Sequence, residues 1–211
     1  AGKKEARQRR GDVSQIHQHK RNFDGFQDVV DRKTSDFTSP ARYGLGYIEY
    51  QFKNFPKAIE WLSQTVSDVR FAEMSAYYIL ECRFMLKDYD FVIVEGPKMY
   101  QTVPEDRKAH LARIISESYL VKGLISDARK YYNLSLTGPV DDNTRADWFY
   151  SGSVLYAVQD YKGAIDNFMR MGERNDSIGQ IASYNLGYSY IQTKDKVSAM
   201  GASQEASQRK S

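Results

Sequence analysis

The chain has 211 residues, of which 41% are hydrophobic and 27% are charged, a composition that suits a folded domain with an apolar core. The formal net charge is +3, and because the first ten residues carry +4, the remaining 201 residues carry −1. A body this close to neutral lacks the basic face of a nucleic-acid-binding protein, so we expect no nucleic-acid partner. The single cysteine, Cys82, excludes an intrachain disulfide and a multi-cysteine metal site.

The first 38 residues divide into two parts. Residues 1–11 are rich in Lys and Arg, and no apolar signal-peptide core follows them, so we predict a basic, flexible leader. Residues 12–38 contain Phe26 and Val29 at places that match the second helix of a helix pair. No apolar first helix precedes them, and we therefore expect a leading half-repeat.

The rest of the chain repeats. Five pairs of small or apolar residues lie 12 positions apart, and the first members of the pairs advance by 34, 36, 36 and 35 residues. Small residues at this spacing let two antiparallel helices cross closely, because neither backbone carries a bulky side chain at the crossing. The pairs are Gly46 with Ala58, Leu80 with Val92, Ser116 with Ala128, Gly152 with Ala164, and Gly187 with Ala199.

Helix breakers and caps mark the predicted boundaries in chain order. Pro40 is expected in the first turn of a helix, where its missing N–H costs nothing, and Pro56 marks the turn into the second helix. The Gly96-Pro97 pair should kink or shorten the second helix of its repeat. Residues 138–143 form a predicted loop that ends at the N-cap of the helix containing Trp148.

The aromatic residues follow the same period. A bulky residue stands three positions before the second member of four pairs, and these residues are Phe55, Tyr89, Ile125 and Tyr161. The segment DWFYSGSVLYAVQDYKGAIDNF, residues 147–168, carries the pattern most fully. It resembles the tetratricopeptide repeat, whose period is about 34 residues. The resemblance extends over roughly residues 40–206. This part of the sequence also loosely resembles the long tetratricopeptide chains of bacteria.

This resemblance implies an all-α fold, a right-handed superhelical α-solenoid of antiparallel helix pairs spanning residues 12–211. Each pair must stack on its neighbours, because it cannot bury its own apolar face alone. We predict a half-repeat at 12–38 and five repeats at about 39–71, 72–104, 105–140, 141–175 and 176–211. The last repeat has no polar capping helix after it, so we expect a segment of a longer chain, or one end of an assembly that could self-associate through its unfinished repeats.

First helices of successive repeats would line a concave groove. Positions three before, one after and four after the small residue share one helix face. Most are tyrosines, which combine a large apolar ring with a hydroxyl that can form hydrogen bonds. The same rings could instead pack between neighbouring repeats. The predicted groove residues are Tyr43, Tyr47, Tyr50, Tyr77, Glu81, Arg113, Glu117, Phe149, Ser153, Tyr156, Tyr184 and Tyr188.

The sequence lacks recognisable catalytic and metal-binding motifs. It contains no Gly-rich phosphate loop, nucleophile elbow or metal-binding His pair, so we predict no enzyme activity, no cofactor and no metal. His17, His19 and His110 are expected to face solvent. Cys82 is expected to be a small buried hydrophobe rather than a nucleophile.

The functional prediction is a non-catalytic scaffold that binds a peptide or helix of a partner protein in the tyrosine-rich groove. Two alternatives stay open: a module of the bacterial envelope that binds a glycan or another small ligand, and the targeting domain of a larger enzyme. No apolar run reaches the roughly 20 residues that span a bilayer, so no transmembrane segment is expected. Either a cytoplasmic or a periplasmic, envelope-associated location would fit.

Overall fold

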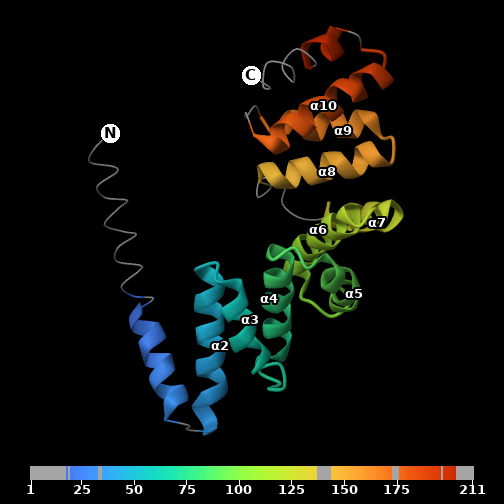
Figure 1. The fold of residues 1–211 in the computed structure, drawn as a ribbon. Coiled ribbons are helices and arrows are strands. Elements are labelled where there is room, and N and C mark those ends of the chain that lie inside the picture. Colours follow the sequence, from blue (N-terminus) through green and yellow to red (C-terminus); the bar gives the residue numbers. More distant parts are fainter. Residues whose placement is uncertain are drawn as a thin grey trace, which may run out of the picture. The chain divides into compact units, whose positions relative to one another are not determined.

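A computed structural model describes residues 18, 20–32, 35–136, 144–172, 176–195 and 197–202 (Figure 1). All regular secondary structure within these ranges is helical, as predicted. The chain divides into two compact units, Ala1–Asp88 and Tyr89–Ser211, which are described separately. The boundary between them falls inside the predicted repeat 72–104, and the repeat limits stay predictions.

The first unit contains three long helices, α2 (Ser35–Gln51), α3 (Phe55–Ser63) and α4 (Ala72–Met85). Helices α2 and α3 form the first antiparallel pair, and α4 packs against both (Figure 1). Residues 20–31 are also helical, and the Phe26 ring lies against Gly44 of α2, where a β-carbon would come within 2.5 Å of it. The predicted half-repeat therefore supplies a helix that packs on α2.

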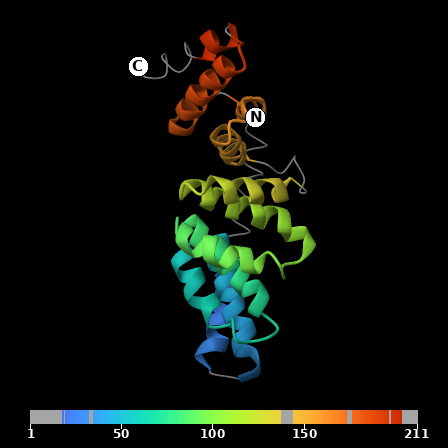
Figure 2. The same cartoon turned by 90° about the vertical axis from the view of Figure 1, so that its right-hand side faces the viewer.

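The second unit contains α5 (Tyr89–Met99), α6 (Glu105–Val121), α7 (Ile125–Ser135), α8 (Arg145–Ala157), α9 (Tyr161–Arg170) and α10 (Ser177–Gln192). Figure 2 shows the green to red helices of this unit from a second direction. Each helix contacts the next in sequence, and the first helices also contact one another, α6 with α8 and α8 with α10. These contacts are those of stacked helix pairs.

Small residues make the close helix crossings that the sequence predicts. A β-carbon on Gly46 would lie 2.6 Å from Cγ of Leu62, and one on Gly152 would lie 2.7 Å from the Phe168 ring. In the third repeat the hydroxyl of Ser116 donates to the Ala128 carbonyl oxygen at 2.7 Å. The crossing thus accepts a small polar residue, provided that its hydroxyl finds an acceptor.

The turn between the first and second helix is also repeated. In all five repeats the residue seven positions after the first member of the pair (Gly46, Leu80, Ser116, Gly152 or Gly187) has a left-handed backbone, with φ between 60° and 75°. Only one of the five is a glycine, although glycine adopts this conformation most easily. The residues are Lys53, Lys87, Gly123, Gln159 and Lys194.

The predicted place of Pro40 was wrong, and so was the predicted shortening of the helix at Pro97, whereas a kink at Pro97 stays a prediction. Helix α2 begins at Ser35, so Pro40 lies beyond its first turn, inside the helix. Helix α5 continues through Pro97 to Met99, and its 11 residues match the length of α7. Pro97 cannot donate to the carbonyl of Ile93 four residues earlier, and the Tyr119 hydroxyl donates to that carbonyl instead at 3.2 Å.

Two other boundary predictions were confirmed in part. Helix α3 begins at Phe55 with Pro56 in its first turn. The predicted loop 138–143 lies outside the described residues, but the helix that contains Trp148 begins with a capping box. Its Thr144 side chain accepts from the backbone of Asp147, and the Asp147 carboxylate accepts from the Thr144 N–H at 2.7 Å.

The crossing at Gly46 gives a test of packing. In an exposed helix Gly→Ala is stabilising, but Gly46→Ala forces a methyl group against the fully buried Leu62, so we expect a loss of about 1–3 kcal/mol in the free energy of unfolding. Gly25→Ala is the matched control, because no atom lies within 4 Å of its β-carbon position, and it should be neutral or stabilising. Urea denaturation of both variants makes the comparison; equal effects would contradict the close crossing.

Candidate functional site

In the first unit, the predicted groove residues of α2 belong to one aromatic cluster. The Tyr47 ring lies 6.5 Å from Tyr43, 6.3 Å from Tyr50 and 5.3 Å from Tyr78 of α4, measured between ring centroids. Tyr43 in turn stacks on Phe71 at 5.0 Å. Tyr47 is 38% exposed, so the centre of this cluster reaches solvent.

A polar contact joins α2 to α4 beneath these rings. The Tyr50 hydroxyl donates to the Glu81 carboxylate at 2.7 Å, and Glu81 is only 6% exposed. Burial and the neighbouring carboxylate raise the pKa of Tyr50 well above its ordinary value, which keeps the hydroxyl protonated as a donor. Tyr77, also predicted for the groove, is 6% exposed and packs on Tyr78 at 5.6 Å.

In the second unit, the predicted groove residues of α6 contact α8. Arg113 forms an ion pair with Asp147, with 3.1 Å between Nε and Oδ1. The hydroxyl of Tyr150, which lies one turn after Asp147 on α8, is close enough to the Glu117 carboxyl group to shift its pKa. The two pairs tie the third repeat to the fourth, in the way that Tyr50 and Glu81 tie α2 to α4.

Glu117 is an unusual carboxyl group. Only 9% of the residue is exposed, and burial, reinforced by the charge of Asp147, raises its pKa to about 8. The Tyr150 hydroxyl and the Arg113 charge lower this pKa, but they do not overcome burial. At neutral pH this side chain is largely protonated, and it is the carboxyl group of the site that changes charge near physiological pH.

The remaining predicted residues lie on α8 and α10. Phe149 and Tyr156 are half-buried, and the hydroxyl of Ser153, also half-buried, donates to the Phe149 carbonyl at 2.8 Å. The Tyr156 ring lies 5.7 Å from Tyr188 of α10. On α10 the exposed fraction rises to 68% at Tyr184 and 39% at Tyr188.

The geometry shows a common rule within each unit. Tyr47 and Tyr50, one and four positions after Gly46, contact α4, the first helix of the next repeat. Arg113 and Glu117, three positions before and one after Ser116, contact α8 in the same way. The structure therefore brings predicted residues together in neighbouring pairs, and it leaves exposed rings at Tyr47, Tyr184 and Tyr188. A binding role for these exposed rings stays a proposal.

Two residues of the clusters were not among the predicted groove positions. Tyr78 and Tyr150 each stand two positions before the first small residue of their repeats. Both side chains point back to the preceding first helix, Tyr78 onto Tyr47 and Tyr50, and Tyr150 onto Glu117. Aligning the repeats column by column shows tyrosine twice at this position, which is the sequence signal that identifies them.

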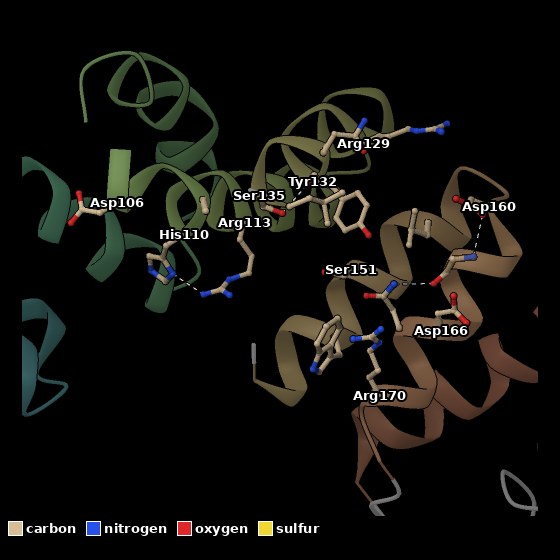
Figure 3. A pocket seen from close by; sticks show the side chains of 17 residues that line it. Asp106, His110, Arg113, Arg129, Tyr132, Ser135, Ser151, Asp160, Asp166 and Arg170 are labelled. Atoms are coloured by element: carbon tan, nitrogen blue, oxygen red, sulfur yellow. Dashed lines mark hydrogen bonds between the residues drawn. The ribbon is translucent and has the colours of Figure 1, made fainter. Parts of the chain in front are cut away.

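A separate cavity of about 620 Å³ lies among α6, α7, α8 and α9 (Figure 3). Arg113, Arg129 and Arg170 line it together with Asp106, Asp160 and Asp166. The Arg170 guanidinium lies 4.9 Å from the centre of the Trp148 ring, which also lines the cavity. Acidic and basic groups are balanced, so the cavity does not select a ligand of one charge.

Cys82 and the histidines are the other residues with a predicted environment, and the structure tests two of them, Cys82 and His110. Cys82 is fully buried, as predicted, and burial raises the pKa of its thiol to about 12, which disfavours the thiolate. His110 is half-buried rather than solvent-facing, with its Nδ1 2.7 Å from Nη2 of Arg113. His17 and His19 lie outside the described residues.

Within the described residues, no helix combines the length and the apolarity needed to cross a membrane. The same residues contain no group of three or more His, Cys, Asp or Glu side chains placed to hold a metal ion.

Solved structures resemble this arrangement. YrrB, described as a TPR protein with an unusual peptide-binding site, has a TM-score of 0.65 at 14% identity, covering 87% of this chain and 91% of its own. MamA of MSR-1 gives 0.63 at 16% identity, with 83% and 98% covered. BtubC from P. vanneervenii gives 0.58 at 13% identity, with 94% and 90% covered.

The chain has the fold of the tetratricopeptide repeat proteins. The all-α class of paired, TPR-like helices that the sequence predicts is thereby confirmed. No family model matches the sequence, and no curated protein matches it. At these identities the likeness establishes the fold, and the ligand must be argued from the side chains.

Glu117 gives the α6–α8 contact a predicted pH dependence. Between its ordinary pKa of 4.5 in the unfolded chain and about 8 in the folded one, the folded state keeps a proton that the unfolded state has released. The free energy of unfolding should therefore fall as pH rises from about 5 to about 8, by at most about 1.4 kcal/mol per pH unit.

The variant Glu117→Gln keeps the shape of the side chain but cannot titrate, so the difference in stability between wild type and variant should change steadily across this range. Urea denaturation of both proteins at several pH values measures it. Parallel pH profiles would show that Glu117 has an ordinary pKa.

Proposed function

We propose that the chain is a non-catalytic scaffold that binds a peptide or helix of a partner protein on the tyrosine-rich faces of its first helices. The observation that carries the proposal is the aromatic cluster of α2 and α4, with Tyr47 38% exposed at its centre. Large aromatic residues that reach solvent together are typical of protein-binding surfaces.

The contacts beneath the surface make this cluster suitable for binding. Tyr50 is held by Glu81, and Tyr78 lies within 4.9 Å of the Tyr50 ring centre, so the rings around Tyr47 are fixed before a ligand arrives. A partner side chain that docks on Tyr47 would order few groups, and binding loses less conformational entropy when the surface is already ordered. The neighbouring rings offer apolar area, which favours a partner with apolar side chains.

Proteins of this fold support the same class of function. The structure of YrrB is described by its peptide-binding site, and another structure of the same fold, at a TM-score of 0.58 and 15% identity, is the quorum sensor NprR. These descriptions favour recognition of a peptide or protein over catalysis for this chain. The identity of the partner is a separate question, which needs capture from the source organism.

The test replaces the exposed ring. Tyr47→Ala should remove most of the binding of proteins captured from a lysate of the source organism, with a loss of about tenfold or more in affinity, because truncated aromatic anchors cost about 2 kcal/mol or more. Phe37→Ala is the matched control: Phe37 is 67% exposed on the same helix, and none of the described ring contacts of the Tyr47 cluster includes it.

Proteins identified by mass spectrometry as bound to wild type and Phe37→Ala, but not to Tyr47→Ala, would support the proposal. Equal capture by all three would contradict it. Loss of binding to immobilised glycans, rather than to proteins, in Tyr47→Ala would favour the glycan-binding alternative. Circular dichroism should show the same helicity for all three chains, since both replaced rings reach solvent.

A further inference from the structure

Helix α10 has apolar residues on two sides. One side is buried and holds Gly179, Ala182, Ser183, Gly187 and Ser189. The other side exposes a row of four large side chains, here called the α10 stripe: Ile181 at 51%, Tyr184 at 68%, Tyr188 at 39% and Ile191 at 57%. Four large side chains in one exposed row are more apolar surface than a solvated helix face usually carries.

The position of the α10 stripe in the repeat indicates what should cover it. Ile181 and Tyr184 stand six and three positions before the small residue Gly187, and Tyr188 and Ile191 stand one and four positions after it. In α6 the residues three before and one after the small residue are Arg113 and Glu117, and both contact the next first helix, α8. By this equivalence, Tyr184 and Tyr188 of the α10 stripe stand at positions that, in α6, contact another first helix.

The spacing of the α10 stripe is symmetrical. Ile181 and Ile191 each lie five residues from Leu186, and Tyr184 and Tyr188 each lie two residues from it. Steps of three, four and three residues form the a/d seam of a coiled coil. Two such helices can pair antiparallel about a two-fold axis at the level of Leu186. Ile181 of one helix then meets Ile191 of the other, and Tyr184 meets Tyr188.

The absence of charged side chains on α10 also favours pairing. Between Ser177 and Gln192 the helix contains no Asp, Glu, Lys, Arg or His, so two copies can approach without like-charge repulsion. In an antiparallel pair the helix dipoles oppose each other favourably. The Tyr188 ring is also held in place, since it lies 5.7 Å from Tyr156 and 6.0 Å from Tyr161.

We propose that the α10 stripe binds the α10 stripe of a second copy of this chain in an antiparallel, two-fold symmetric pair. Each copy contributes the same residues, as a two-fold interface requires. Complete cover of the four side chains would bury on the order of 400 Å² per copy, the range of a weak and reversible dimer. This interface lies in the second unit and is independent of the binding surface around Tyr47 in the first.

The symmetry gives a charge-pair test. Ile181→Glu should weaken dimerisation about tenfold or more, because it places an unpaired carboxylate against Ile191 of the second copy. Ile191→Lys should do the same with an ammonium group. The double variant Ile181→Glu/Ile191→Lys should regain dimerisation, because each new carboxylate then faces a new ammonium group across the two-fold axis, twice in every dimer.

Sedimentation equilibrium of the full chain, from about 5 to about 300 µM, measures the dissociation constants over the range expected for an interface of this size. Val69→Glu is the control, since Val69 is 92% exposed and lies in the other unit. Thermal unfolding checks that all variants stay folded, which is expected because Ile181 and Ile191 are more than half exposed.

A wild-type dimer that both single variants weaken and the double variant restores would support the pairing. A monomeric wild type at the highest concentration would overturn it, and so would a dimer that no single variant weakens. A dimer weakened by both single variants but not restored by the double variant would overturn the antiparallel register.

Discussion

The stacking of one first helix on the next is the interaction on which the rest of this structure depends. Tyr50 and Glu81 make this contact in the first unit, and Arg113 with Asp147 and Glu117 with Tyr150 make it in the second. A single helix pair cannot bury its own apolar face, so each repeat is stable only with its neighbours in place. The side chains that could serve binding are drawn from the same positions as those that hold the stack.

That double use explains why the tyrosine positions divide into two kinds. On the first helices from α2 to α8, the predicted positions are buried or half-buried, as at Tyr77, which is 6% exposed, with the exception of Tyr47 at 38%. On α10, Tyr184 occupies the position equivalent to Arg113 and is 68% exposed. In the functions that we propose, recognition extends this internal stacking, because the face that packs on the next repeat would also pack on another chain.

Much of the fold could be predicted from the sequence. The spacing of Gly46 and Ala58, repeated through the chain, locates the helix pairs because a close crossing leaves no room for a side chain, and this constraint acts directly on residue type. The left-handed turns could not be found in this way, because Lys53, Lys87, Gln159 and Lys194 do not mark a positive φ as glycine would. The Ile93 carbonyl that Pro97 leaves without its helical donor accepts from a distant hydroxyl, that of Tyr119, which local rules do not include.

The candidate site was predicted less completely, since helical periodicity gives the face of a helix but not what covers it. The most direct test of the stacking account is a double-mutant cycle with Tyr50→Phe and Glu81→Met, measured by urea denaturation, because methionine keeps the length of the side chain but removes the carboxylate acceptor. A buried hydrogen bond of this kind predicts a coupling free energy on the order of 1 kcal/mol or more between the two positions. A coupling of zero, with each substitution acting independently, would contradict the claim that first helices are joined through these positions.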